Sequence, residues 1–385
     1  MAGLMGCLGA AHLASGDCAD RGAAVVGAFM IEEGKLLTNV NYVEYNTQST
    51  IENHAGIIDF PHFDIVPIAT DHHYLGSEQS VDINASSPVH RHIMKEWKIL
   101  EGAKNLPDSI YVQAYETRID LMRAVIIGSP GTPYHDGLFF FDICLPHDYP
   151  NQPPKVHYIS HGYRLNPNLY ETGKVCLSLI NTWRGDEDEM WTPKSTILQT
   201  LVSIQGLVLN DNPYFNEPYI SEHGQRPEIV NKSIVYNHNA FILSCKSMIH
   251  IMRNPPKNFE NFVVCHFRAR AGLILAAVRD YEKGRMMVGM IDQNSVDSVE
   301  TVKFNLWRIR LELVIAFSPY ISVAMINMDD DDDDDVVVKT RDNDDVVVIT
   351  RENEDVVVKT KENVKKHKKR VWSKLIIAYA KCIWN

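Results

Sequence analysis

The most constraining feature of this sequence is a series of apolar runs joined by short connections rich in glycine and proline. The runs SIYVQAY (109–115), LMRAVIIG (121–128) and LFFFDICL (138–145) have the composition of β-strands, and a shorter run, VHYIS (156–160), follows two prolines. Connections this short join antiparallel neighbours. The sequence therefore predicts a four-stranded antiparallel meander.

Helical patterns lie on both sides of this meander. Over residues 90–103 apolar side chains recur at helical spacing, and Pro107 follows the segment. A second helix is predicted to begin near Thr192 and Pro193. Its apolar positions recur at every third or fourth residue: Ile197, Leu201, Ile204 and Val208. This order of elements predicts an α+β fold in which the sheet packs on one central helix, with an N-terminal helix before it and further helices after it.

The chain divides into four parts that differ in composition and in apolar periodicity. Residues 1–88 show no sustained periodicity and form an N-terminal region of unclear structure. Residues 89–283 carry the strand and helix patterns and form the predicted core with a C-terminal helical extension. Residues 284–328 form an apolar and mixed linker, and residues 329–385 form an acidic and valine-rich tail.

The tail contains a tandem repeat of ten residues, in which valine triplets begin at Val336, Val346 and Val356. Such repeats either pair as β-strands or stay disordered, and we favour a disordered tail. The apolar run at 306–326 is not predicted to span a membrane, because it has charged residues at one end and a proline inside.

Charge and cysteine usage narrow the classes of protein. The net charge of −11 argues against a general nucleic-acid-binding surface, although seven consecutive aspartates at 329–335 supply much of it. The seven cysteines are widely spread and form no CxxC pair, which argues against a disulfide framework or a zinc site. This pattern suits a reducing compartment, so we expect a cytoplasmic or nuclear protein. The N-terminal segment lacks a basic n-region, and no signal peptide is predicted.

The stretch NPNLYETGKVCLSL (166–179) places Cys176 eight residues after Asn168. A lone cysteine with apolar neighbours is most often a buried core thiol. The alternative is a nucleophile, and the residues around Cys176 favour that alternative only when they are considered together with the motifs on either side.

Those motifs resemble a ubiquitin-conjugating (E2) enzyme. The stretches are TPYHDGLFFFDICLPHDYPNQPPKV, NPNLYETGKVC, WTPKSTILQTLVSIQGL and NPYFNEPY, and they lie in the family's order between about residues 90 and 283. The resemblance is greatest to the large plant E2 subgroup whose member controls phosphate homeostasis, related to the animal E2/E3 hybrid enzymes. It implies the α+β ubiquitin-conjugating fold.

The resemblance also implies roles for three residues. Cys176 would carry ubiquitin as a thioester, because a thiolate is both a good nucleophile and a good leaving group. Asn168 would stabilise the oxyanion that forms when lysine attacks. The alternative is a turn-former that holds the loop, and both roles can apply at once. Glu217 would orient the incoming lysine, with Asn216 as its competitor and Asp211 as a helper; a solvated surface charge is the alternative.

The sequence departs from the family pattern in three places. Asn166 replaces the family's loop-shaping histidine, and an amide could substitute for it. An acidic insertion, Asp186 to Glu189, lies between Cys176 and Trp191, and we expect it to overhang the thiol and to oppose its ionisation. The positions at which ubiquitin ligases dock in the family are polar, Asn151 and Lys194, which indicates weakened docking.

The predicted function is therefore an enzyme that accepts ubiquitin from the activating enzyme (E1) on Cys176 and transfers it to a substrate lysine, with E3-like self-sufficiency as an option. The expected partners are ubiquitin, E1, substrate proteins and E3 ligases, with no nucleic acid, cofactor or metal. Two alternatives remain: a catalytically inert scaffold of the ubiquitin pathway, and an E2 for another ubiquitin-like modifier. A charging assay with ubiquitin, E1 and ATP discriminates among the three.

Overall fold

The chain forms two compact units, Met1–Gly56 and Ile57–Asn385, in the computed structural model. The structure describes residues 60–76, 87–102, 106–217, 220, 226–288 and 300–317, together with the backbone of four short strands at 31–32, 35–36, 337–341 and 345–349. In the first unit, the short strands β1 (Ile31–Glu32) and β2 (Lys35–Leu36) pair antiparallel. The second unit contains the predicted core.

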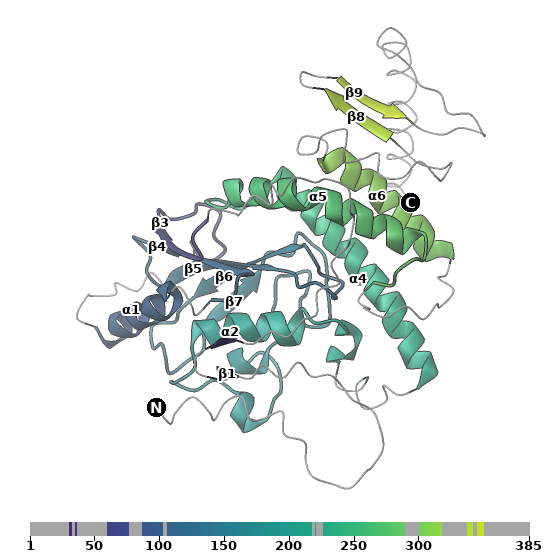
Figure 1. The fold of residues 1–385 in the computed structure, drawn as a ribbon. Coiled ribbons are helices and arrows are strands. Elements are labelled where there is room, and N and C mark those ends of the chain that lie inside the picture. The colour runs from purple at the N-terminus through teal and green to yellow at the C-terminus, as the bar shows by residue number, and fades with distance from the viewer. Residues whose placement is uncertain are drawn as a thin grey trace. The chain divides into compact units, whose positions relative to one another are not determined.

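The predicted meander is the centre of the second unit (Figure 1). Its strands are β4 (Ile110–Tyr115), β5 (Leu121–Ile127), β6 (Leu138–Cys144) and β7 (Lys155–Tyr158), and each pairs antiparallel with the next. The first three strands are buried along almost their whole length, because helices cover both faces of the sheet. This explains why the sequence shows continuous apolar runs there instead of alternation. The α+β fold class is confirmed.

The sheet has a fifth strand, which the four-stranded prediction did not include. β3 (Phe63–Val66) pairs parallel with β4, with Phe63 opposite Val112 and Val66 opposite Tyr115. The resulting order is β3-β4-β5-β6-β7, a mixed sheet. β3 is only four residues long, lies at an edge of the sheet and has no fully buried residue, so it was not recognised as a strand. It comes from the region before residue 88 that showed no periodicity.

A buried ion pair fastens the turn after β3 to the sheet. Arg123 on β5 is fully buried, and its Nε and Nη2 donate to the Asp142 carboxylate on β6 at 2.6 and 3.0 Å. Its Nη1 donates to Asp71 at 2.8 Å, and the backbone N–H of His73 donates to Asp142 at 2.7 Å. Each charge is therefore paired and hydrogen-bonded, which offsets the cost of its burial.

Two helices cover one face of the sheet. α1 (Pro88–Glu101) is capped by Ser87, and α2 (Ile197–Ser203) begins with a capping box formed by Thr196 and Gln199. Their side chains form one core with the sheet, and this core includes Ile93, Leu100, Ala124, Phe141, Leu201 and Ile204. The second helix begins later than Thr192 and Pro193, because these residues form a turn in which Ser195 N–H donates to the Thr192 carbonyl at 2.9 Å.

The central helix continues from α2 as a π-helical segment, η4 (Ile204–Val208). Gln205 holds this segment against the loops at the sheet edge, since its Nε2 donates to Ser109 Oγ at 2.6 Å. π-helical turns inside helices are frequent at functional sites. Here the segment ends at Val208, whose carbonyl faces the loop that contains Cys176.

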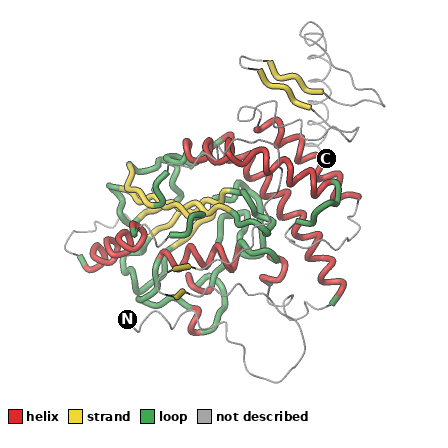
Figure 2. The backbone as a smooth tube through the Cα atoms, in the orientation of Figure 1, coloured by secondary structure: helices red, strands yellow, loops and turns green. Residues whose placement is uncertain are grey.

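Three longer helices cover the opposite face of the sheet: α4 (Pro227–Arg253), α5 (Glu260–Glu282) and α6 (Glu300–Phe317). They form a second core with the sheet, which includes Tyr111, Val125, Phe140, Phe241, Phe267 and Leu313. The backbone tube shows the strands between these helices and α1 and α2 (Figure 2). Among the described residues α5 alone has the length and composition to cross a membrane, which is weak evidence because its Phe262, Phe267 and Ile274 are core residues.

Strands β8 (Val337–Arg341) and β9 (Asp345–Ile349) come from the first two valine repeats. They pair antiparallel, with Lys339 opposite Val347. Strand pairing, the less favoured of the two interpretations, thus describes this part of the repeats. The third repeat and the C-terminal apolar segment lie outside the described residues.

Candidate active site

Asn168 and Cys176 lie side by side at the base of a small hairpin that follows β7. The hairpin closes through an antiparallel bridge between Leu169 and Val175 and through the Tyr170 N–H, which donates to the Lys174 carbonyl at 3.0 Å. At its base, the Cys176 N–H donates to the Asn168 carbonyl at 2.8 Å, and Asn168 Nδ2 donates to the Cys176 carbonyl at 3.0 Å. The hairpin thereby brings Asn168 and Cys176, which are eight residues apart in sequence, into direct contact.

Gly173 allows this hairpin to turn close to the sheet. Its φ angle is +85°, in the left-handed region that favours glycine. A Cβ atom at this position would lie 2.0 Å from the His157 ring on β7. Any other residue would therefore strain the backbone and displace His157.

Asn166 shapes the loop that leads into the hairpin. Its side chain is fully buried; Oδ1 accepts from the backbone N–H groups of Asn168 at 2.8 Å and Leu169 at 3.0 Å. Its Nδ2 donates to the Val208 carbonyl at 2.9 Å. A single amide thus satisfies three backbone groups and connects the loop to the end of the π-helical segment. The amide can therefore do the work expected of the family's histidine.

Burial and neighbouring charges act in opposite directions on Cys176. The residue is 1% exposed, and burial raises the pKa of its thiol. The positive charges of Lys174 and Arg164 lower this pKa, and so does hydrogen bonding from Tyr170, whereas the carboxylate of Glu217 raises it. Glu217 therefore lies within electrostatic reach of the thiol, although it is far from it in sequence.

The segment before Glu217 is held by a chain of asparagine side chains. Asn216 ends the short helix η5 (Pro213–Asn216), and its Nδ2 donates to the Val208 carbonyl at 3.4 Å. Asn210 Nδ2 donates to Asn216 Oδ1 at 2.7 Å. The Asn216 amide is thus used in holding the segment, while Glu217 acts on the thiol. The Val208 carbonyl accepts from both Asn166 and Asn216 and so joins the two arms of the site.

Asp211 and the acidic insertion lie at the surface. Asp211 is exposed, and its backbone carbonyl accepts from Asn237 Nδ2 at 2.8 Å. The residues Asp186 to Glu189 are all exposed, three of them in the short helix η3 (Glu187–Glu189). They are not among the groups that shift the pKa of Cys176 most; Glu217 is the carboxylate that does so. A carboxylate that is distant in sequence from Cys176 therefore acts on its thiol.

The positions associated with ligase docking lie near the insertion. Asn151 and Lys194 are both exposed. Between them, Trp191 anchors the end of the insertion, since its Nε1 donates to the Pro150 carbonyl at 2.7 Å.

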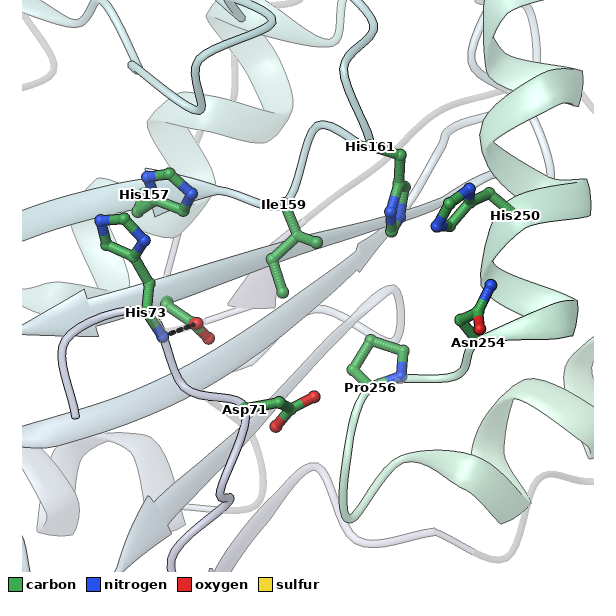
Figure 3. Close-up of a pocket in the computed structure, with 9 residues that line it drawn as sticks. Asp71, His73, His157, Ile159, His161, His250, Asn254 and Pro256 are labelled. Carbon is green, nitrogen blue, oxygen red and sulfur yellow. Dashed lines mark hydrogen bonds between the residues drawn. The ribbon is translucent and has the colours of Figure 1, made fainter. Parts of the chain in front are cut away.

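A histidine-lined cavity of about 290 Å³ lies at another place, between β7 and the end of α4 (Figure 3). The rings of His73 and His157 stack with their centroids 3.5 Å apart, and those of His161 and His250 stack at 4.2 Å. Burial and the neighbouring imidazole lower the pKa of His157 and that of His161 to about 4. Within the described ranges, no group of His, Cys, Asp and Glu could hold a metal ion. This cavity could not be predicted from local sequence patterns, because its residues come from four separate segments.

Known proteins that are similar to this chain indicate its family. Residues 92–240 match the family model described as "Ubiquitin-conjugating enzyme". The chain is 46% identical over 253 residues to "Putative ubiquitin-conjugating enzyme E2 38" of Arabidopsis thaliana, an alignment that covers 66% of this chain and 77% of that protein. It is 48% identical over 276 residues to "Probable ubiquitin-conjugating enzyme E2 24" of the same plant, which covers 70% of this chain and 30% of that protein.

A human relative is more distant. The chain is 36% identical over 218 residues to "Dual E2 ubiquitin-conjugating enzyme/E3 ubiquitin-protein ligase BIRC6" of Homo sapiens, which covers 55% of this chain and 4% of that protein. The protein therefore belongs to the ubiquitin-conjugating enzyme family. It spans less than half of the length of several of its plant relatives; for E2 24 the share is 30%.

Proposed function

We propose that this protein is an E2 that carries ubiquitin as a thioester on Cys176 and transfers it to a lysine of a substrate protein. The observation that carries the proposal is the hydrogen-bonded pair of Asn168 and Cys176, with Glu217 acting on the same thiol. No other described cysteine has such neighbours. Cys245 is buried in the core beneath the long helices, Cys144 is buried in a small cluster with Tyr115 and Leu121, and Cys265 is exposed on α5.

The first step is an exchange of thioesters. The Cys176 thiolate attacks the carbonyl carbon of the ubiquitin thioester on E1, a new C–S bond forms, and the E1 thiolate leaves. The thiolate is the reactive form, so the positive charges of Lys174 and Arg164 favour this step by partly offsetting burial.

In the second step the neutral amine of a lysine attacks the thioester carbonyl. An oxyanion forms, then collapses to an amide and releases the Cys176 thiolate, and the amine loses a proton. Asn168 Nδ2 lies beside the reacting residue and has a second N–H that can be directed to the oxyanion. Removing one such donor typically costs about a hundred- to a thousand-fold in rate.

In this step Glu217 acts on the incoming lysine amine. Its carboxylate lies within reach of the thiol, so it can accept a hydrogen bond from the lysine ammonium and hold it near the thioester. A carboxylate in this position both orients the nucleophile and takes part in removing its proton. The contacts of Asn216 and Asn210 keep the segment in place.

The partners implied by this reaction are ubiquitin, E1 and substrate proteins, with E3 ligases as additional partners or E3-like activity within the same chain. The free cysteines of the described residues fit a cytoplasmic or nuclear setting. An E2 for another ubiquitin-like modifier would use the same site, whereas an inert scaffold would not need the arrangement at Cys176.

A charging assay tests the proposal. The full chain is incubated with ATP and matched pairs of activating enzyme and modifier, and the products are separated on a non-reducing gel. We expect a band that is larger by one ubiquitin and that disappears with thiol reductant. Charging only by another modifier, or by none, would contradict the proposal.

A further inference from the structure

Two cationic side chains flank an aromatic ring beside Cys176. The Arg164 guanidinium lies over the Tyr170 ring at 4.3 Å from its centroid, and the Lys174 ammonium lies 5.6 Å from the same centroid. Such cation–π contacts hold the charges in place without neutralising them. Both side chains are exposed, and in the described part of the chain neither forms an ion pair with a carboxylate.

Arg164 and Lys174 lie around the Cys176 thiol, and we call this surface the rim. Tyr170 and Lys174 belong to the hairpin that ends at Cys176, and Arg164 precedes the loop held by Asn166. Glu217 lies near the same group, because Arg164 and Glu217 both act on Tyr236 of α4. Among the charged groups that shift the pKa of Cys176 most, the hairpin side supplies the two cations and the segment after η5 supplies the carboxylate of Glu217.

We infer that Arg164 and Lys174 select acceptor lysines that have acidic residues beside them. The inference rests on the proposed function. When an acceptor lysine reaches Cys176, the side chains next to it in the substrate must pass over the hairpin and meet the Arg164–Tyr170–Lys174 group. A flanking carboxylate would pair with the guanidinium or the ammonium. A flanking lysine or arginine would be repelled.

The positive charge of the acceptor lysine makes an acidic residue beside it in the substrate more important. Arg164 and Lys174 repel the lysine ammonium as it approaches, and Glu217 attracts it. An acidic neighbour in the substrate offsets this repulsion and leaves the reacting amine beside Glu217. Because the rim charges are exposed, each pair contributes modestly, and a preference of about three- to tenfold is expected from two pairs.

The test uses the full chain charged with ubiquitin, followed by single-turnover discharge to three peptides. The peptides share one lysine and a common length, and their flanking residues are glutamate, serine or arginine. Discharge to free lysine normalises each variant. We expect the wild type to react about three to ten times faster with the glutamate peptide than with the serine peptide, and most slowly with the arginine peptide. Raising the salt should reduce this ratio, since exposed charges are screened over about 8 Å at physiological salt.

Three variants distinguish a specific loss of the substrate preference from a general loss of activity. The double change Arg164→Ala with Lys174→Ala should bring the glutamate-to-serine ratio close to one, and Arg164→Glu with Lys174→Glu should invert it. Arg268→Ala removes an exposed arginine from α5 and should leave the ratio unchanged. A charged wild type that discharges equally to all three peptides at low salt would overturn the inference and leave the proposed function intact. A chain that forms no ubiquitin thioester would overturn both.

Discussion

The side-chain amide of Asn168 donates to the backbone carbonyl of Cys176 at 3.0 Å, and the Cys176 N–H donates back to the Asn168 carbonyl at 2.8 Å. This reciprocal pair ties the candidate nucleophile to the candidate oxyanion donor. It gives Asn168 two roles, one in holding the loop and one in the chemistry, and the two roles have different consequences.

Replacing Asn168 with alanine separates those roles. We expect Asn168→Ala to accept ubiquitin from E1 at nearly the wild-type rate, because the backbone hydrogen bond between residues 176 and 168 remains. Discharge to free lysine should fall about a hundred- to a thousand-fold, because the oxyanion loses its donor. Single-turnover kinetics measure the two steps separately. Equal losses in both steps would show that Asn168 only holds the loop.

Asn166 should matter for stability. Asn166→Ala leaves two backbone N–H groups and the Val208 carbonyl without this partner, and each unsatisfied buried group costs about 1–3 kcal/mol. We expect a clear loss in the free energy of unfolding, measured by urea denaturation. Asn166→His should recover part of it, because imidazole supplies one donor and one acceptor. An alanine variant as stable as the wild type would contradict the hydrogen bonding described for this loop.

The buried pair of Arg123 and Asp142 gives a second stability prediction. Asp142→Ala leaves the guanidinium buried and without its main partner, which typically costs about 3–5 kcal/mol. The matched control is Lys257→Ala, which breaks an exposed pair with Glu260 at 3.8 Å and should cost less than about 1 kcal/mol. Similar losses in the two variants, measured by urea denaturation, would show that the buried pair does not anchor the turn after β3.

The histidine cavity predicts a fall in stability at mildly acidic pH. His157, facing His73, His72 and Asp142, and His161, facing His250, both have a pKa of about 4 in the folded protein, below the ordinary 6.5. The unfolded chain therefore binds protons at higher pH than the folded chain does. Stability should be full above about pH 6.5 and decline as the pH falls toward 4. Asp136 has a pKa of about 2 in the folded protein, so its contribution to stability is lost only at a lower pH than that of the histidines.

Urea denaturation at several pH values tests this dependence. The double variant His157→Gln with His161→Gln should flatten the decline between pH 6.5 and 4. Part of the slope should remain, because His238 on α4 also has a pKa of about 4. His92→Gln, which changes an exposed histidine on α1, serves as the control. An unchanged slope in the double variant would show that the stacked pairs do not exclude protons.

The sequence predicted the parts of the fold that depend on local pattern. Strands β4 to β7 are long apolar runs with short connections, and α1 and α2 have clear apolar periodicity, so both could be recognised without tertiary information. β3 could not, because four partly exposed residues gain their structure only by pairing with Val112 to Tyr115, far along the chain. The same holds for the strand pair in the repeats, where composition left two interpretations open.

The candidate site shows the same division. Asn168 and Cys176 meet through a local hairpin, and their spacing was therefore informative. The Val208 carbonyl that joins Asn166 to Asn216 depends on a π-helical segment and on a long-range approach, for which no local pattern exists. The acidic insertion was expected to act on the thiol because it is close to Cys176 in sequence. The charged groups that shift the pKa of Cys176 most are Lys174, Arg164 and Glu217, and Glu217 is distant in sequence.

The measurement that tests the central claim most directly is the identity of the residue that carries ubiquitin. After incubation with E1, ubiquitin and ATP, Cys176→Ser should give a band that resists thiol reductant but is cleaved by base, as an oxyester is, and Cys176→Ala should give none. The control Cys265→Ser, which changes the exposed cysteine on α5, should charge like the wild type. Reducible charging of Cys176→Ala, or its loss in Cys265→Ser, would contradict the account.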